Sequence, residues 1–353
     1  MFHKFRLPDL KPLSSVARSS LAIALLVTIG IAAGGCGQRN KWHKSAGAVW
    51  NTTYTVTYEA PRDLSDSIQA VFREIDNSLS VFNKSSLVTR INNNDSTALV
   101  DMHFRRVFDM SVDVNRRGKG LFDPTVAPLV NLWKFGNTGK VSPDSVYEPS
   151  RAQIDSALAF VGLAGCSITP RGRVVKKHPA TSFNFSAVAK GYACDVLAEM
   201  LRRNGSGNVM VEIGGEVTAF GHSPRGDSWR LQIDCPVDQS DVPTHEAIDY
   251  LEITDCGVAT SGNYRNYHES SFGRVGHTID PVTGYPRVSN ILSATVIAPD
   301  CALADAWATA VMAAPTVAEA DSLLRAAGLN ALIITSDSVP GRYRFFRVQH
   351  ETP

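Results

Sequence analysis

The sequence predicts an α+β fold, built as one large domain or two closely joined ones. Helical and strand-forming segments are mixed along the 353 residues, without the regular alternation that a parallel sheet requires. With 44% hydrophobic and 20% charged residues, the composition is that of a globular protein with a large core. The sequence contains no internal repeat and no low-complexity tract, so disorder is not expected.

The first 35 residues have the pattern of a secretory signal peptide. A basic segment precedes an apolar core at 21–33, which is too short for a comfortable membrane span, and small residues then lead to Cys36. Ala33-Gly34-Gly35-Cys36 resembles a bacterial lipobox, although Leu is usual where Ala33 stands. We therefore expect cleavage before Cys36 and a lipid on its sulfur. An ordinary signal peptide with a chance cysteine is the alternative.

This pattern predicts an exported protein that a lipid anchors to a bacterial membrane, on the periplasmic side. The expected organisation is a signal peptide over residues 1–35, the lipidated cysteine and a tether over 36–47, and a single domain over 48–353. Within the tether, residues 39–45 are polar.

The N-terminal part of the domain is predicted to contain one strand and three helices. Residues 48–58 are rich in β-branched and aromatic residues that alternate with polar ones, which predicts a strand. Residues 65–82 carry apolar side chains at helical spacing, and 104–118 and 150–161 are predicted as further helices.

The C-terminal part mixes helices and strands. The predicted helices are 186–203, 299–310 and 317–327. The predicted strands are a pair within 173–185, then 208–221, 229–235, 250–254, 293–298, 331–335 and 343–349. Gly214-Gly215 interrupts the strand 208–221 and predicts a bulge or a close approach of another backbone. Residues 260–267 are predicted as a polar loop.

Charge and cysteine usage exclude some classes of protein. The formal net charge is +1, and removal of the first 35 residues leaves 31 basic and 33 acidic side chains. There is no basic stripe, so no nucleic-acid partner is expected. Five cysteines follow Cys36 without a C-x-x-C motif or zinc-type spacing, which favours scattered thiols over a disulfide framework and leaves a single disulfide open.

Asp305 and Thr309 are candidates for a metal site. They stand four residues apart in an Ala-rich helical segment, so the carboxylate and the hydroxyl share one face, which we expect to be exposed. Oxygen ligands of this kind suit Mg²⁺, with phosphate or water completing the coordination. The alternative is a surface acid and a threonine bonded back to its own helix.

Lys190 is a candidate anion-binding residue. A cation at the start of a helix opposes the helix dipole, so its presence there indicates an anion nearby. Neither a Walker A motif nor a G-x-G-x-x-G after the first strand is present, so the common nucleotide-binding folds are not supported.

Eight groups of residues, five of which include predicted strand–helix junctions, follow one another along the chain. They are Asn51-Thr-Thr-Tyr54, Leu79-Ser-Val-Phe-Asn83, Gly120-Leu-Phe-Asp-Pro-Thr-Val126 with Trp133, Ala187-Val-Ala-Lys-Gly-Tyr-Ala193 with Asp195, Ile213-Gly-Gly-Glu216, Thr260-Ser-Gly-Asn-Tyr264, His277-Thr-Ile-Asp-Pro281 with Thr283-Gly284, and Ala304-Asp-Ala-Trp-Ala-Thr-Ala310. In this combination and order they resemble the ApbE family, the FAD:protein FMN transferases, over about residues 48–335.

The resemblance implies a mixed fold with strands and helices around a flavin-nucleotide cleft. It implies an enzyme that binds FAD with Mg²⁺, releases AMP and joins FMN by a phosphoester to a threonine or serine of an exported redox-complex subunit or reductase. The implied metal ligands are Ala187 through its carbonyl, Asp305 and Thr309. The implied FAD contacts are Trp50, Phe82, Leu121, Phe122, Asp123, Asn184, Lys190 and Ile279.

Three positions depart from the pattern of the family. Asn51 stands where glycine is frequent, Phe82 replaces a frequent tyrosine, and Asn184 replaces a frequent aspartate. These departures bear on substrate preference more than on the reaction, since the metal pair and Lys190 are retained.

His277 and Asp280 are candidates for orienting or deprotonating the incoming hydroxyl, because phosphoryl transfer depends on charge neutralisation and a positioned nucleophile. A structural histidine and an Asp-Pro turn are the alternatives. At the level of function, the alternatives to the transferase are a Mg²⁺-dependent FAD pyrophosphatase, which forms FMN and AMP, and an FAD-binding lipoprotein without activity.

Overall fold

The computed structural model describes residues 40–135, 146–236, 247–263, 267–271, 273–339 and 342–349. All helices and strands named below belong to the compact unit that begins at Lys41. The expected signal peptide over 1–35 and the lipidation site at Cys36 lie outside the described residues. Within the described residues, no helix is long and apolar enough to cross a membrane.

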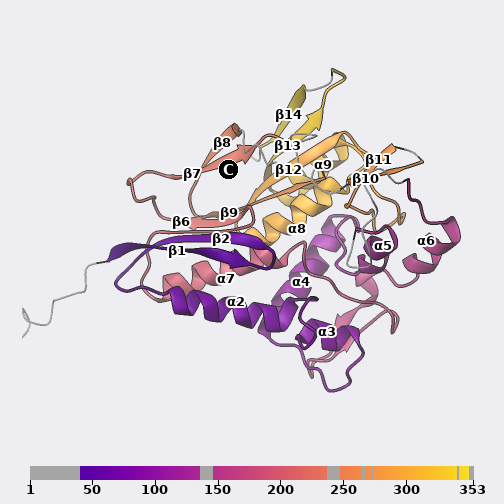
Figure 1. Cartoon of the computed structure of the whole chain (residues 1–353), viewed down its shortest axis with the longest axis horizontal. Helices are drawn as coiled ribbons and strands as arrows, with labels where there is room; N and C mark the ends of the chain where they lie inside the picture. Colours follow the sequence, from indigo (N-terminus) through magenta and orange to yellow (C-terminus); the bar gives the residue numbers. More distant parts are fainter. Residues whose placement is uncertain are drawn as a thin grey trace, which may run out of the picture. The chain divides into compact units, whose positions relative to one another are not determined.

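An eight-stranded antiparallel sheet forms the centre of this unit (Figure 1). Its strands, in spatial order, are β1 (Lys41–Val49), β2 (Thr52–Ala60), β5 (Val209–Ile213), β6 (Glu216–Phe220), β9 (Cys256–Gly262), β12 (Ile291–Ala298), β13 (Asn330–Ser336) and β14 (Tyr343–Val348). In β2 every second side chain, including those of Tyr54, Val56 and Tyr58, is buried. Successive side chains of a strand point to opposite faces, so the alternating sequence pattern of β2 buries its apolar residues on one face of the sheet.

The first two strands form a hairpin, so the prediction of one strand over 48–58 is wrong. Val49 pairs with Thr52, and the two residues between them, Trp50 and Asn51, have φ angles of 48° and 62°. Such angles at both central positions are typical of a type I′ hairpin turn. The predicted tether is also wrong from Lys41 onward, since those residues form β1. The polar pattern there is that of an edge strand.

The double glycine forms a second hairpin turn and not a bulge. Ile213 pairs with Glu216, while Gly214 and Gly215 adopt φ angles of 63° and 104° that L-residues rarely adopt. The Gly214 N–H donates to the Thr53 carbonyl at 3.0 Å, so the two hairpin turns lie side by side at one end of the sheet.

Two helices, α7 (Ala189–Arg203) and α8 (Cys301–Met312), pack on the sheet (Figure 1). α7 contacts β5 and β6, whereas α8 contacts β9 and β12. Further out, α2 (Ser65–Leu79) packs on α7 and α4 (Met102–Arg117) packs on α8. Ten of the twelve residues of α8 are buried, which explains its Ala-rich sequence between the sheet and other helices.

The remaining elements surround this layered core. They are α3 (Leu87–Asn92), α5 (Ala127–Leu132), α6 (Arg151–Leu158), a 3₁₀ turn (Leu163–Gly165), α9 (Val317–Ala327), β3 (Ser167–Ile168), β4 (Val174–Val175), β7 (Trp229–Asp234), β8 (Ala247–Ile253), β10 (Tyr267–Ser270) and β11 (Gly273–Gly276). A smaller apolar cluster under α5 and α6 is formed by Leu129, Trp133, Ile154, Val161 and Ile279.

The α+β prediction is confirmed, and most predicted elements are present. Besides the corrections above, two local predictions are wrong. Only Val174–Val175 of residues 173–185 forms a strand, and residues 260–262 end β9 where a polar loop was expected. The five described cysteines are free thiols, as expected.

Candidate active site

Two cavities share the segment that leads into α7. One, of about 600 Å³, is lined by residues of the β1–β2 turn, the end of α2 and the first turn of α7. The other, of about 200 Å³, is lined by the segment before α5, the 277–281 loop and Thr309 of α8. Ser186 lines both cavities, so they adjoin at this segment.

The larger cavity contains Trp50 and Phe82, two of the aromatic residues that the resemblance implies as FAD contacts. Trp50 lies in the hairpin turn, and its ring packs edge-on against Phe72 at a centroid distance of 5.5 Å. Phe82 lines the same cavity with 64% of its surface exposed. An exposed aromatic face beside an apolar wall can stack on a planar ring. Asn51 also lines this cavity and shares the turn with Trp50.

The smaller cavity has an apolar wall formed by Leu121, Phe122 and Ile279, all of which are buried. Asp123 and Asn184 also line this cavity, but their side chains accept hydrogen bonds from backbone N–H groups of the protein. The Asp123 carboxylate accepts hydrogen bonds from the backbone N–H groups of Thr125 (2.7 Å) and Leu163 (2.9 Å).

Burial raises the pKa of Asp123, and the bonds from Thr125 and Leu163 oppose that shift. The Asn184 side chain accepts from the Ser186 N–H at 3.0 Å, while the Asn184 N–H donates to the Pro124 carbonyl at 2.7 Å. These bonds hold the backbone that lines the cavity in place.

Lys190, Glu216 and Asp305 form a charged centre at the start of α7. Lys190 lines the larger cavity with about a third of its side chain exposed, and its ammonium forms an ion pair with the buried Glu216. Burial lowers the pKa of Lys190, but the charges of Glu216 and Asp305 outweigh it, so the net shift is upward. Lys190 is therefore a fixed positive charge at the wall of the cavity.

The two acids of this centre are both buried. Burial raises the pKa of Glu216, with Lys190 opposing, and one of its oxygens, Oε2, has no hydrogen-bond partner. Asp305 is only 3% exposed, so the expectation of an exposed helix face is wrong. The small alanines around Asp305 let α7 and the sheet cover it. Its Oδ2 accepts from the Gly191 N–H at 3.2 Å, and burial raises its pKa against the opposing effect of Lys190.

Ala187, Asp305 and Thr309 suit the expected Mg²⁺ in the chemistry of their donor atoms. Ala187 and Thr309 line the same cavity, and Asp305 lies one helical turn from Thr309. A carbonyl, a carboxylate and a hydroxyl are hard oxygen donors. Among the described residues, no three His, Cys, Asp or Glu side chains gather as a metal site, so the carbonyl and the hydroxyl would be essential.

The two candidate catalytic residues have different surroundings. His277 is exposed and lines the smaller cavity together with Thr309. Asp280 is buried, and its carboxylate accepts from the Val282 N–H (2.9 Å), the Thr283 hydroxyl (2.8 Å) and the Arg287 guanidinium. These bonds favour the turn-forming alternative for Asp280.

Trp133 supports the same loop from the side of the smaller apolar cluster. Its indole N–H donates to the Gly284 carbonyl at 2.8 Å. This contact explains why Trp133 belongs to the motif set although it lies far from this loop in the sequence.

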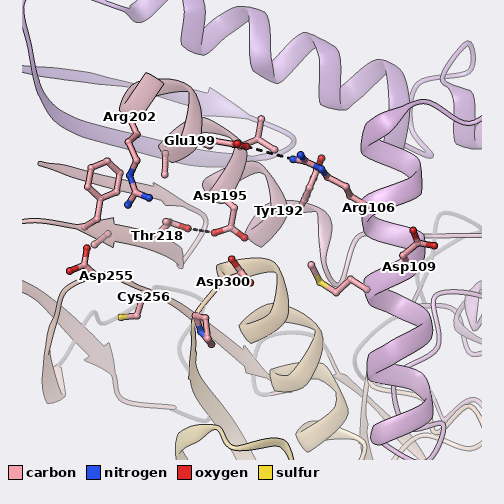
Figure 2. Close-up of a pocket in the computed structure, with 16 residues that line it drawn as sticks. Arg106, Asp109, Tyr192, Asp195, Glu199, Arg202, Thr218, Asp255, Cys256 and Asp300 are labelled. Atoms are coloured by element: carbon pink, nitrogen blue, oxygen red, sulfur yellow. Dashed lines mark hydrogen bonds and ion pairs between the residues drawn. The ribbon is translucent and has the colours of Figure 1, made fainter. Parts of the chain in front are cut away.

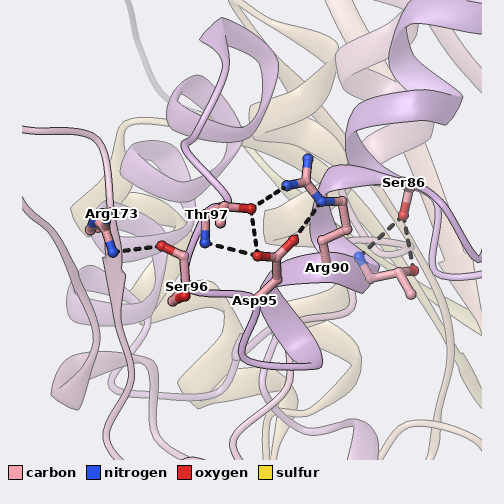
Figure 3. Close-up of polar contacts among 7 residues, drawn as sticks. Ser86, Arg90, Asp95, Ser96, Thr97 and Arg173 are labelled. Atoms are coloured by element: carbon pink, nitrogen blue, oxygen red, sulfur yellow. Dashed lines mark hydrogen bonds and ion pairs between the residues drawn. The ribbon is translucent and has the colours of Figure 1, made fainter.

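Two further cavities bring together none of the candidate FAD or metal residues. One, of about 890 Å³, lies between α4, α7 and the β6 region and includes Asp195 and Asp300 (Figure 2). The other is small and polar, and lies beside the loop that Asp95 and Arg173 brace (Figure 3). There the Arg90 guanidinium contacts Asp95 at 2.8 Å, and Ser86 accepts from the Thr89 N–H at the start of α3.

Sequence reasoning missed two residues of this region, Glu216 and Asp195. Both belong to quoted motifs, so the signal was present. Their partners lie on other elements, so no local pattern could assign either residue a role.

Comparisons with known proteins identify the family. Residues 50–333 match the model of the ApbE family. The chain is 34% identical over 303 residues to the FAD:protein FMN transferase of Salmonella typhimurium and 32% identical over 300 residues to that of Escherichia coli, with 83% of each chain covered in both cases.

Solved structures give the same result. The chain is similar to the flavin transferase ApbE from Vibrio cholerae, with a TM-score of 0.75 and 28% identity over 88% of this chain and 98% of the other. It is also similar to the apo flavinyl transferase ApbE of Pseudomonas stutzeri, with a TM-score of 0.76 and 28% identity over 88% and 96% of the two chains. The chain therefore belongs to the ApbE family.

Proposed function

We propose that this chain is an FAD:protein FMN transferase. The hydroxyl oxygen of a threonine or serine on an acceptor protein attacks the phosphorus of the FMN half of FAD. The bond from that phosphorus to the bridging oxygen breaks, AMP leaves, and the hydroxyl proton is lost. The observation that carries the proposal is the convergence of Lys190, Ala187 and Thr309 on two adjoining cavities, with Asp305 beside them.

The cavities suggest how FAD would lie. Trp50 and Phe82 would hold the flavin ring in the larger cavity, and Leu121, Phe122 and Ile279 would contact the nucleotide in the smaller one. The diphosphate would then cross the Ser186 segment, where the Lys190 ammonium can neutralise it. Asp123 and Asn184 would contribute mainly by fixing the backbone around that crossing.

Mg²⁺ would be held by the Ala187 carbonyl, Asp305 and Thr309. When bound, it neutralises negative charge on the diphosphate. His277, exposed at the smaller cavity, would accept the proton of the incoming hydroxyl. Asp280 would hold the 277–284 loop in place through Thr283 and Arg287, without taking a proton itself.

The acceptor would be an exported redox-complex subunit or reductase. The predicted signal peptide and lipobox at Cys36 support an enzyme anchored by lipid to a bacterial membrane, on its periplasmic side. In a cell, this placement would bring the exported acceptor and the enzyme to the same compartment.

The test combines the detergent-solubilised chain with FAD, Mg²⁺ and a candidate acceptor, and separates the flavin products by chromatography. The proposal predicts AMP in step with loss of FAD, and no matching rise of free FMN. Equal amounts of AMP and free FMN would instead indicate an FAD pyrophosphatase. Bound FAD without AMP would indicate a lipoprotein that stores or delivers FAD.

A further inference from the structure

The N-termini of α7 and α8 lack caps of their own. Val188 precedes α7 and Asp300 precedes α8, and neither side chain makes a capping hydrogen bond. The first N–H groups of a buried helix need partners from elsewhere, because an unpaired buried N–H is costly.

Each helix is capped by a carboxylate of the other. Asp305 of α8 accepts from the Gly191 N–H in the first turn of α7 at 3.2 Å. In return, Asp195 of α7 accepts from the N–H groups of Cys301 (3.0 Å) and Ala302 (2.9 Å) in the first turn of α8. The helices are thus tied together in both directions.

Asp195 is also tied to the sheet. The Thr218 hydroxyl on β6 donates to Asp195 at 2.6 Å (Figure 2). Burial raises the pKa of Asp195 to about 6, while the bonds from Thr218, Ala302 and Cys301 oppose the shift. At neutral pH the carboxylate is therefore ionised and suited to the positive end of the α8 dipole.

The backbones of the two helices are in direct contact at Gly191 of α7 and Cys301 of α8. A Cβ on Gly191 would lie 2.4 Å from the Cys301 carbonyl oxygen. With no side chain between the backbones, a slip of α8 along α7 would change the position of Asp305 and Thr309 relative to Ala187 and Lys190.

We propose that Asp195 is a positioning residue of the active centre, because it fixes the N-terminus of α8 against α7 and β6. The position of α8 in turn sets the distance of Asp305 and Thr309 from the Ala187 carbonyl, and a divalent cation requires that distance to be correct. Asp195 lines the cavity of Figure 2 and neither of the two cavities assigned to FAD, so it acts through α8 and not by contact with the nucleotide. The proposal depends on the metal ligands of the proposed function.

The test compares Asp195→Asn with Asp300→Asn in the full chain. Asp300 stands at the same helix end but makes no side-chain cap, so its variant is a matched control for loss of charge. Mn²⁺ is the probe, measured by electron paramagnetic resonance, and FAD binding without metal is measured by flavin fluorescence. Asp195→Asn should weaken Mn²⁺ binding about tenfold, as loss of an outer-shell partner does, and leave metal-free FAD binding unchanged. Asp300→Asn should alter neither.

A second control tests whether a less stable fold by itself weakens Mn²⁺ binding. Leu324→Ala, in the buried face of α9, should lower the melting temperature without weakening Mn²⁺ binding. Equal Mn²⁺ affinity of Asp195→Asn and the wild type would overturn the proposal, as would an equal loss in Leu324→Ala.

If Asp195→Asn does not fold, Thr218→Val removes one donor and keeps the carboxylate. It should weaken Mn²⁺ binding in the same direction by a smaller factor, and unchanged affinity would overturn the proposal. A wild-type chain that binds neither Mn²⁺ nor FAD would refute the proposed function itself.

Discussion

At the scale of single residues, Lys190 joins the larger cavity to the buried acids. A lysine at the start of a helix is unfavourable for the helix dipole, but here Glu216 and Asp305 stabilise the charge. The same ammonium lines the cavity, where it can meet a phosphate. The residue is thus held in place before any nucleotide binds.

Replacing Lys190 by methionine removes this charge and keeps most of the volume of the side chain. We expect FAD to bind about 2 kcal/mol more weakly, or roughly 30-fold, as for loss of a charged hydrogen bond. Titration of flavin fluorescence measures the change. An affinity equal to that of the wild type would show that Lys190 does not contact the diphosphate.

Asp305→Asn should abolish Mg²⁺-dependent release of AMP while the chain stays folded. The amide keeps the size of the carboxylate and can still accept from the Gly191 N–H, but it is a poor ligand for Mg²⁺. Circular dichroism checks the fold, and chromatography measures AMP. Full activity in this variant would refute the metal assignment.

Glu216→Gln breaks the ion pair with Lys190 and leaves a buried amide. Removal of one partner of a buried pair costs about 3 kcal/mol of the free energy of unfolding. Glu212→Gln is the control, because Glu212 lies on the same hairpin and its carboxylate accepts hydrogen bonds from backbone N–H groups, those of Gly214 and Gly215, the latter at 2.9 Å. That variant should lose about 1 kcal/mol. Equal urea midpoints for the two variants would contradict the structural role of the pair.

At the scale of elements, the sequence predicted α7, α8 and most strands, because apolar period and β-branched alternation are local signals. The two hairpin turns were missed for a physical reason. Trp50-Asn51 lacks the usual Asn-Gly pattern, and a Gly-Gly pair is compatible with either a bulge or a turn. The burial of Asp305 and the capping of α8 by Asp195 depend on how α7 packs against α8. No local sequence pattern predicts this packing.

The close approach of α7 and α8 predicts an effect of Gly191→Ala. The new Cβ would meet the Cys301 backbone, which cannot rotate away as a side chain could. We expect a loss of about 3 kcal/mol in the free energy of unfolding, measured in urea. Gly207→Ala is the control, since nothing lies within 4 Å of a Cβ at that position. If both variants are equally stable, the helices do not pack as described.

At the scale of the whole molecule, segments far apart in the sequence meet at the α7 N-terminus. The β1–β2 turn and the end of α2 form one cavity there, and the 277–281 loop and Thr309 form part of the other. The motif resemblance predicted the family, and the comparisons confirm it. The roles that the resemblance implied for these residues stay predictions. The resemblance could not show that Asp123 and Asp280 are engaged in structural bonds, because those partners are set by tertiary contacts. The lipidation of Cys36 stays a prediction.

The central claim is the transfer of FMN to protein, and the intact mass of the acceptor tests it most directly. After incubation of the acceptor with the enzyme, FAD and Mg²⁺, we predict a mass increase of one FMN less one water. The addition should map to a single threonine or serine and be absent with Asp305→Asn. An acceptor that keeps its mass while FAD is converted to AMP and free FMN would contradict the account.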